Sequence, residues 1–165
     1  MHPSDRIVIA DFANRTGENG LDATLKLALA VNLQREPSLE VLSDAHAREA
    51  LRSLEWSQQT PVNGPVAREV CTLQQGAAVI EGSIAIFGSR YALGLEAVSC
   101  GTGAVIGREM VEARSKDEVL AALDLAAESL RRKLVEALNS ARRNRPTQLA
   151  VRGLTDAPVG RARGR

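Results

Sequence analysis

The sequence is poor in aromatic residues, histidine and cysteine. Only 2% of its 165 residues are Phe, Trp or Tyr, so few rings are present on which nucleic-acid bases could stack. Two cysteines do not make a disulfide scaffold. Without further Cys or His at ligand spacing they do not make a zinc site either. We therefore expect no metal and no cofactor.

Long apolar segments are also missing. No apolar run approaches the roughly 18 residues that a membrane helix requires. The N-terminus, MHPSDR, has no hydrophobic segment of the kind found in signal peptides. We therefore expect no membrane segment in this chain.

Histidine offers no support for an enzyme. His2 lies at the terminus, and His46 lies early in a predicted helix, where exposure to solvent is the expected state. No motif brings an acid, a base and a nucleophile together, and neither a glycine-rich nucleotide loop nor an HRD or DFG motif is present. We predict that the protein is not an enzyme.

Three glutamates lie on predicted strands and could in principle converge as paired carboxylates (Glu81, Glu96 and Glu109). Such residues more often form the solvated face of a sheet. They also often pair across strands with cations, here Arg90 and Arg108. We therefore favour a structural role for them over a glycosidase or metal site.

The near-neutral net charge of +1 hides an uneven distribution. Residues 142–165 contain seven arginines and one aspartate, for a net charge of +6. The preceding 141 residues hold the remaining 14 basic and 19 acidic residues, for a net charge of −5. The chain is thus an acidic body followed by a basic segment.

The region from Gly76 to Ala113 predicts three consecutive β-strands, at about 78–87, 91–98 and 104–112, with apolar residues at alternate positions. Glycine-containing turns at 88–89 and 101–103 separate them. Connections this short permit only antiparallel neighbours. One face of this meander needs to be covered by the rest of the chain. The central strand places four apolar residues on that face (Tyr91, Leu93, Leu95 and Ala97).

The remaining segments complete an α+β fold, an α/β sandwich in which helices cover a mixed sheet of about five strands. Strands are expected at 6–12 and 39–42, and helices at 22–35, 45–54 and 64–75, the last with an apolar face of Val66, Val70 and Leu73 or Gln74. The element order β-α-β-α-α-β-β-β-α gives one parallel pair through a right-handed crossover.

A long final helix is expected from residue 119 to about residue 141. Ser115 and Glu118 form a capping-box sequence, in which each side chain bonds to a backbone N–H near the other residue. Residues 142–165 lack an apolar period and are rich in Gly, Pro and Arg, so we predict that they are disordered. A single domain would then span residues 1–141.

The strongest candidate site is the polar loop after the first strand, which contains Asp11, Asn14, Arg15, Thr16 and Gly17. Ligands of α/β sheets collect at the carboxyl ends of strands, where helix N–H groups favour anions. The loop lacks phosphate-binding motifs. The alternative is therefore a structural turn held by side-chain bonds from Asn14 and Thr16 to the backbone.

Cys71 lies on a predicted helix and Cys100 at a strand end. Buried free thiols are the expected state in the cytosol. A disulfide between the two becomes plausible if the domain lies outside the cytoplasm.

Several segments, in this order, resemble the TolB N-terminal-like module of bacterial serine/threonine kinases and tetratricopeptide-repeat proteins. The similarity covers about residues 6–138. It is carried by DFANRTG from Asp11, LKLALAV from Leu25, VLSD from Val41, AREVC from Ala67, EGSI from Glu81 and LEAVSCGTG from Leu95. The resemblance favours the disulfide between Cys71 and Cys100, because cysteines at these two places belong to the family pattern.

The resemblance implies a non-enzymatic interaction or ligand-sensing module in a kinase-linked or repeat-protein signalling system. A sheet edge or the loop after the first strand would contact the protein partner. Localisation stays open: the module would lie outside the cytoplasm in the family's membrane-linked architecture, and in the cytoplasm if the chain is complete. The alternative is a small nucleic-acid-associated protein that binds through Arg142–Arg165, weakly and without sequence specificity.

Overall fold

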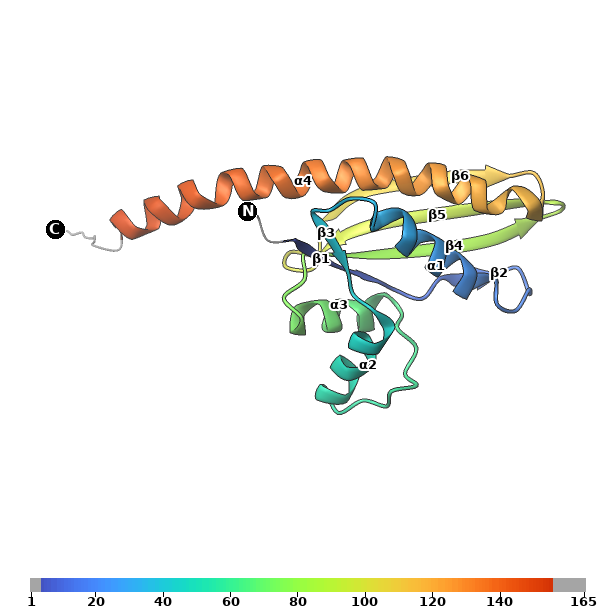
Figure 1. The fold of residues 1–165 in the computed structure, drawn as a ribbon, viewed down its shortest axis with the longest axis horizontal. Coiled ribbons are helices and arrows are strands. Elements are labelled where there is room, and N and C mark those ends of the chain that lie inside the picture. The colour runs from blue at the N-terminus through green and yellow to red at the C-terminus, as the bar shows by residue number, and fades with distance from the viewer. Residues whose placement is uncertain (1–3, 156–165) are drawn as a thin grey trace. The chain divides into compact units, whose positions relative to one another are not determined.

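The structure is a computed structural model that describes residues 4–155, with their side chains up to residue 143. Its elements, drawn in Figure 1, confirm the predicted α+β class. Their bounds are β1 (Asp5–Ile9), β2 (Ala13–Arg15), α1 (Leu21–Leu33), β3 (Leu39–Val41), α2 (Asp44–Ser53), α3 (Gly64–Leu73), β4 (Ala78–Phe87), β5 (Arg90–Ser99), β6 (Val105–Ala113), the 3₁₀ turn η1 (Lys116–Glu118) and α4 (Val119–Thr155).

Six strands form one mixed sheet in the order β3-β1-β4-β5-β6, with β2 also paired to β4. β1 is parallel to both β3 and β4, and β4, β5 and β6 form the predicted antiparallel meander. The prediction of a loop directly after the first strand was wrong in one respect. Residues 13–15 add a short strand parallel to β4 opposite Ser83–Ala85, although their side chains carry no strand signal.

Helices cover both faces of the parallel part of the sheet (Figure 1). α2 and α3 pack on one face through a cluster of buried residues (Val8, Ala10, Ala50, Leu51, Ala67, Val70, Cys71 and Val79). Residues of β1 with the opposite parity, Ile7 and Ile9, are buried on the other face, which α1 and the first part of α4 cover. The predicted inner face of β5 is confirmed, because its four apolar residues are all buried.

Two details of helix packing differ from the predictions. The buried residues of α3 are Ala67, Val70 and Cys71, whereas Leu73 is 43% exposed. The capping box forms only in part: the Glu118 carboxylate accepts from the backbone N–H of Arg114 at 3.2 Å, and the Ser115 side chain makes no capping bond. A 3₁₀ turn intervenes before α4, so the predicted cap and the helix start are separated.

The final helix does not end near Ala141 but continues to Thr155, so it is longer than predicted. This segment has few apolar residues that packing could bury, but arginine itself has a high helix propensity. In addition, the Arg143 guanidinium donates to Ser140 Oγ at 3.0 Å one turn earlier. The chain divides into compact units at residues 1–134 and 135–165, and the rest of the tail prediction lies outside the described residues.

Candidate functional site

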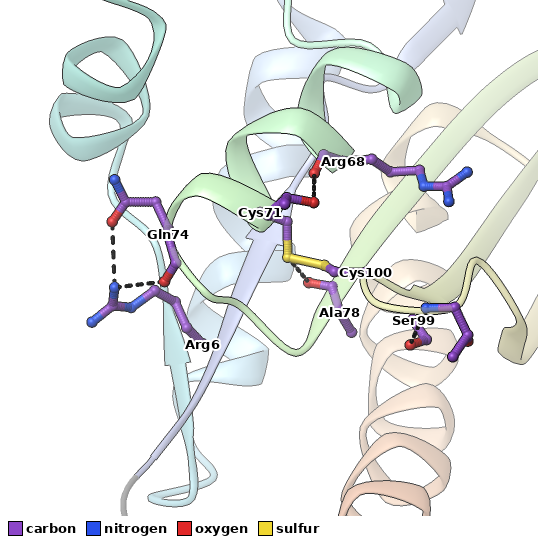
Figure 2. The surroundings of a disulfide bond; sticks show 9 residues. Arg6, Arg68, Cys71, Gln74, Ala78, Ser99 and Cys100 are labelled. Atoms are coloured by element: carbon purple, nitrogen blue, oxygen red, sulfur yellow. Dashed lines mark hydrogen bonds between the residues drawn. A yellow bond between two sulfur atoms is a disulfide. The ribbon is translucent and has the colours of Figure 1, made fainter. Parts of the chain in front are cut away.

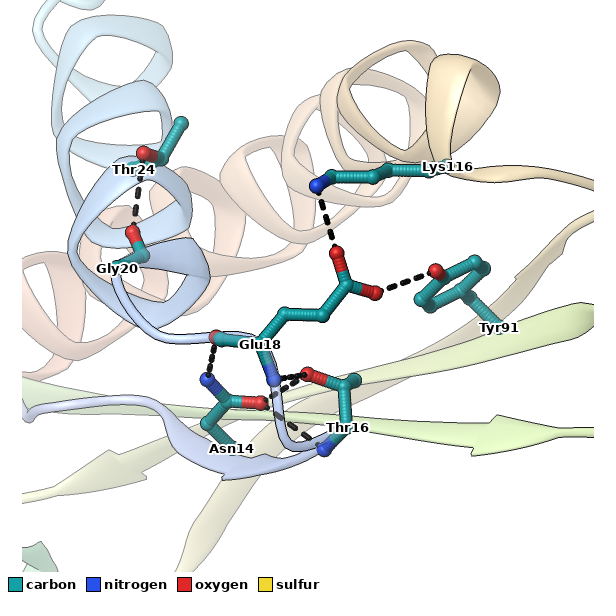
Figure 3. A network of polar contacts seen from close by, with 7 residues as sticks. All are labelled: Asn14, Thr16, Glu18, Gly20, Thr24, Tyr91 and Lys116. Atoms are coloured by element: carbon teal, nitrogen blue, oxygen red, sulfur yellow. Dashed lines mark hydrogen bonds and ion pairs between the residues drawn. The ribbon is translucent and has the colours of Figure 1, made fainter.

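A network of side-chain hydrogen bonds braces the loop between β2 and α1 (Figure 3). Asn14 Oδ1 accepts from the Thr16 backbone N–H at 3.0 Å and from the Thr16 hydroxyl at 2.6 Å. Asn14 Nδ2 donates to the Glu18 carbonyl at 2.9 Å, and the Glu18 N–H donates to Thr16 Oγ1 at 3.1 Å. Asn14 and Thr16 thus hold one backbone conformation, as expected for a structural turn.

The Glu18 carboxylate connects this loop to β5 and to the 3₁₀ turn before α4 (Figure 3). One oxygen accepts from the Tyr91 hydroxyl at 2.6 Å, and the other lies 2.6 Å from Lys116 Nζ. The Lys116 hydrogen bond, followed by that of Tyr91, lowers the pKa of Glu18. The same contact with Glu18 raises the pKa of Tyr91 and that of Lys116.

Replacing Glu18 by Gln should therefore destabilise the protein in a pH-dependent way. A carboxyl group whose pKa is lower in the folded state adds stability above its unfolded pKa, and this stability is lost as the pH falls through the folded pKa. Urea unfolding should show Glu18→Gln to be less stable than the unmodified protein at pH 7, with the difference shrinking below about pH 4. Glu49→Gln, at an exposed glutamate on α2, is the control. A deficit that is the same at pH 7 and pH 3 would contradict this role.

The braced loop presents alternate residues to solvent. Asn14, Thr16 and Glu18 are half-buried, whereas Arg15, Gly17 and the neighbouring Ala13 and Asn19 are exposed. Gly17 has a φ of +80°, in the left-handed region that favours glycine. Within the part of the chain that the structure describes, Arg15 makes no hydrogen bond or ion pair. The loop therefore holds one arginine on a rigid support, available to a partner.

Asp11 belongs to a different region from the rest of the predicted loop. Its Oδ1 lies 2.8 Å from Lys26 Nζ, and its Oδ2 accepts from the Val62 N–H at 2.9 Å. Its own N–H donates to the Val62 carbonyl at 2.7 Å. Asp11 thus joins the end of β1 to the segment before α3. The five predicted site residues do not form one site.

Asp11 and Lys26 lie on a cleft of about 510 Å³ at the carboxyl ends of β1 and β3. The chain leaves these adjacent strands toward helices on opposite faces, the position at which α/β sheets commonly bind ligands. Lys26 Nζ also lies 3.6 Å from Asp44 at the start of α2. The cation therefore links α1 to both β1 and α2, and sequence reasoning did not single it out.

The three strand glutamates do not meet at one point. Glu81 and Glu96 lie opposite each other on β4 and β5. Glu96 pairs with Arg108 across β5 and β6, as the sequence predicted, whereas Arg90 pairs with Glu112 at 3.4 Å.

Glu109 lies on the other, helix-covered face, where Lys133 and Ser129 bind it at 2.5 and 2.9 Å. The Lys133 contact lowers the pKa of Glu109. These contacts assign Glu96 and Glu109 to structural pairs.

The histidines do not meet either. His46 is exposed at the start of α2, as predicted, with its N–H 3.2 Å from the capping Ser43 hydroxyl. His2 lies outside the described residues. Among residues 4–155, no group of three or more His, Cys, Asp or Glu side chains is placed to hold a metal. No helix in that range is long and apolar enough to cross a membrane.

Cys71 and Cys100 are joined as a disulfide that connects α3 to the turn after β5 (Figure 2). Their Cα atoms lie 6.2 Å apart, within the range that disulfides require. Nearby, the Arg6 guanidinium donates to the Gln74 carbonyl at 3.0 Å, which ties the end of α3 to β1. The bond closes a loop with a sequence separation of 29 residues and crosses from helix to sheet.

No protein-family model and no curated protein matches this sequence. Solved structures do match. The LpoB C-terminal domain from Salmonella enterica is 16% identical, with a TM-score of 0.62 over 70% of this chain and 86% of that chain. The lipoprotein GNA1162 from Neisseria meningitidis is 13% identical, with a TM-score of 0.53 over 86% of this chain and 96% of that chain.

TolB from Acinetobacter baumannii also matches. It is 13% identical, with a TM-score of 0.54 over 84% of this chain and 29% of that chain. At such identities the similarity concerns the fold alone, and the association with kinases and tetratricopeptide repeats rests on the sequence resemblance. The chain thus has a fold similar to that of the LpoB C-terminal domain and to part of TolB.

Proposed function

We propose that this chain is a non-enzymatic protein-interaction module whose braced loop at residues 13–19 contacts the partner. The observation that carries the proposal is that the side chains of this loop have two different roles. Asn14, Thr16 and Glu18 use their side chains to hold the backbone, whereas Arg15 is exposed. The fold that the chain shares with the LpoB C-terminal domain and with part of TolB is compatible with such a module.

Rigidity is the physical reason to favour this loop. A loop that is already ordered loses little conformational entropy on binding, so more of its contact energy appears as affinity. The Glu18 contacts with Tyr91 and Lys116 add a tertiary anchor. Arg15 can then form a bidentate bond with a carboxylate of the partner. The partner surface is expected to carry Asp or Glu at this point.

The cellular system is the finer part of the proposal. The resemblance to the TolB N-terminal-like module supports a signalling system that contains a serine/threonine kinase or tetratricopeptide repeats. A ligand-sensing module would use the same rigid loop. If the Cys71–Cys100 disulfide persists in the cell, it favours an oxidising compartment.

Affinity capture tests the module and the nucleic-acid alternative together. The full chain would be used as bait. It would be compared with Arg15→Glu, with Arg48→Glu as a matched exposed control, and with a triple variant in which Gln replaces Arg142, Arg143 and Arg145. We expect the same protein partner to be captured after nuclease treatment, by the triple variant and by the control variant. The Arg15→Glu variant should no longer capture it. Capture that nuclease or the triple replacement abolishes would overturn the proposal in favour of nucleic-acid binding.

A further inference from the structure

We propose that two copies of the chain pair through their β6 edges, antiparallel and centred on Met110. β6 is the last strand of the sheet, and within the described residues only β5 pairs with it. An edge strand presents backbone N–H and C=O groups to which another strand can add. This inference does not depend on the Arg15 contact, so the two proposals can fail separately.

The side chains of β6 have the symmetry that such a dimer needs. On the face away from α4, the strand presents Arg108, Met110 and Glu112 at alternate positions. In an antiparallel pair centred on Met110, each Arg108 lies opposite Glu112 of the second copy. Met110 then lies opposite its own counterpart at the two-fold axis. Opposite charges placed across strands stabilise pairing.

Exposure agrees with this placement. Met110 is 73% exposed and lies beside Gly94, the position at which an added Cβ would come within 2.9 Å of its sulfur. Its thioether therefore lies on the open sheet face, where Met110 of a second copy would lie beside it. Arg108 and Glu112 are also largely exposed, so their charges are accessible.

The charges already present on β5 extend the pattern. Glu96 pairs with Arg108, and Arg90 pairs with Glu112, within one copy. Pairing of the two β6 edges would link Glu96, Arg108, the second copy's Glu112 and the second copy's Arg90 through successive ion pairs. This series of alternating charges adds attractive neighbours without creating a like-charged contact.

Other symmetric registers are less favourable. Shifting the centre by one residue toward the N-terminus places Glu109 opposite Glu109. Shifting it by one residue toward the C-terminus places Arg108 opposite Arg114. Both shifts bring like charges together, which destabilises strand pairing. The charge pattern therefore selects the register centred on Met110.

The Lys133 side chain reaches this backbone edge. Its Nζ donates to the Arg108 carbonyl at 3.3 Å while also pairing with Glu109. A carbonyl oxygen can accept two hydrogen bonds, so this contact leaves one for the second strand. An interface of one strand per copy is at the small end for protein complexes, and the dimer should be concentration-dependent.

Sedimentation of the full chain over a concentration series tests the charge pattern. We expect a monomer–dimer equilibrium that Arg108→Glu or Glu112→Arg weakens by about tenfold or more, because symmetry changes two cross-strand pairs at once. A variant that inverts all four charges (Arg90→Glu, Glu96→Arg, Arg108→Glu and Glu112→Arg) should restore dimerisation, since it keeps the pairs within and between the copies complementary. A monomer at every concentration, or a fourfold variant no better than the single ones, would overturn the proposal.

A cross-link tests the register directly. Opposite residues in an antiparallel pair have Cα atoms about 4.5–5.5 Å apart, a separation that a disulfide can bridge. Met110→Cys should therefore form a covalent dimer on mild oxidation, whereas Phe87→Cys, exposed on β4 away from the axis, should not. Equal cross-linking of both variants, or cross-linking of Phe87→Cys alone, would contradict this arrangement.

Discussion

Reducing the Cys71–Cys100 disulfide is expected to lower the free energy of unfolding by about 3–4 kcal/mol. The bond closes a loop with a sequence separation of 29, so it removes many conformations from the unfolded chain but few from the folded one. Cys71 is fully buried in the α2–α3 core, so the folded state already holds the two residues together.

Urea unfolding with and without reductant measures this effect. A Cys71→Ala/Cys100→Ala variant is the control, and its stability should not respond to reductant. Thiol labelling of the unfolded, unreduced protein should find no free thiol. Free thiols, or a midpoint that reductant leaves unchanged, would show that the bond is not formed in the native protein.

Gly82→Ala is expected to destabilise the protein by about 1–3 kcal/mol, the usual cost of overpacking a core. An alanine Cβ at this position would lie 2.5 Å from two ring atoms of Phe12, which is only 5% exposed. Either the ring or strand β4 must move. Since Phe12 joins β1 to β2, movement of the ring should also disturb the pairing of β2 with β4.

Chemical denaturation compares this variant with Gly101→Ala, where an added Cβ meets nothing within 4 Å. The Gly101→Ala variant should unfold at nearly the same denaturant concentration as the unmodified protein. Adding Phe12→Leu to Gly82→Ala should cost less than the sum of the two single changes, because the smaller side chain leaves room for the methyl group. Additive losses would show that Phe12 and Gly82 are not in contact.

Strong local signals in the sequence explain why most of the fold could be predicted. The glycine turns and the two-residue period between Ala78 and Ala113 predicted the meander. β2 was missed because Ala13–Arg15 has no strand propensity and forms through backbone pairing with β4. The length of α4 was missed because residues 142–155 have no apolar period, which is the signal by which the sequence predicts an amphipathic helix.

The candidate site was predictable only in part. Asn14 and Thr16 were recognised as turn-forming residues, and their side-chain bonds follow from local sequence. The anchoring of Glu18 by Tyr91 and Lys116 joins residues far apart in the chain, and no local pattern identifies such a contact. The bond of Asp11 to Val62, 51 residues away, is equally invisible to a local pattern.

Site-specific photo-crosslinking in the cells that produce the protein tests the central claim most directly. A photoreactive residue would replace Asn19, which is exposed on the braced loop, so that Arg15 is kept, and Leu125, 68% exposed on α4, would serve as the control position. The interaction-module account predicts a discrete adduct with a second protein from position 19 and none from position 125. No adduct at position 19, or the same adducts from both positions, would contradict it.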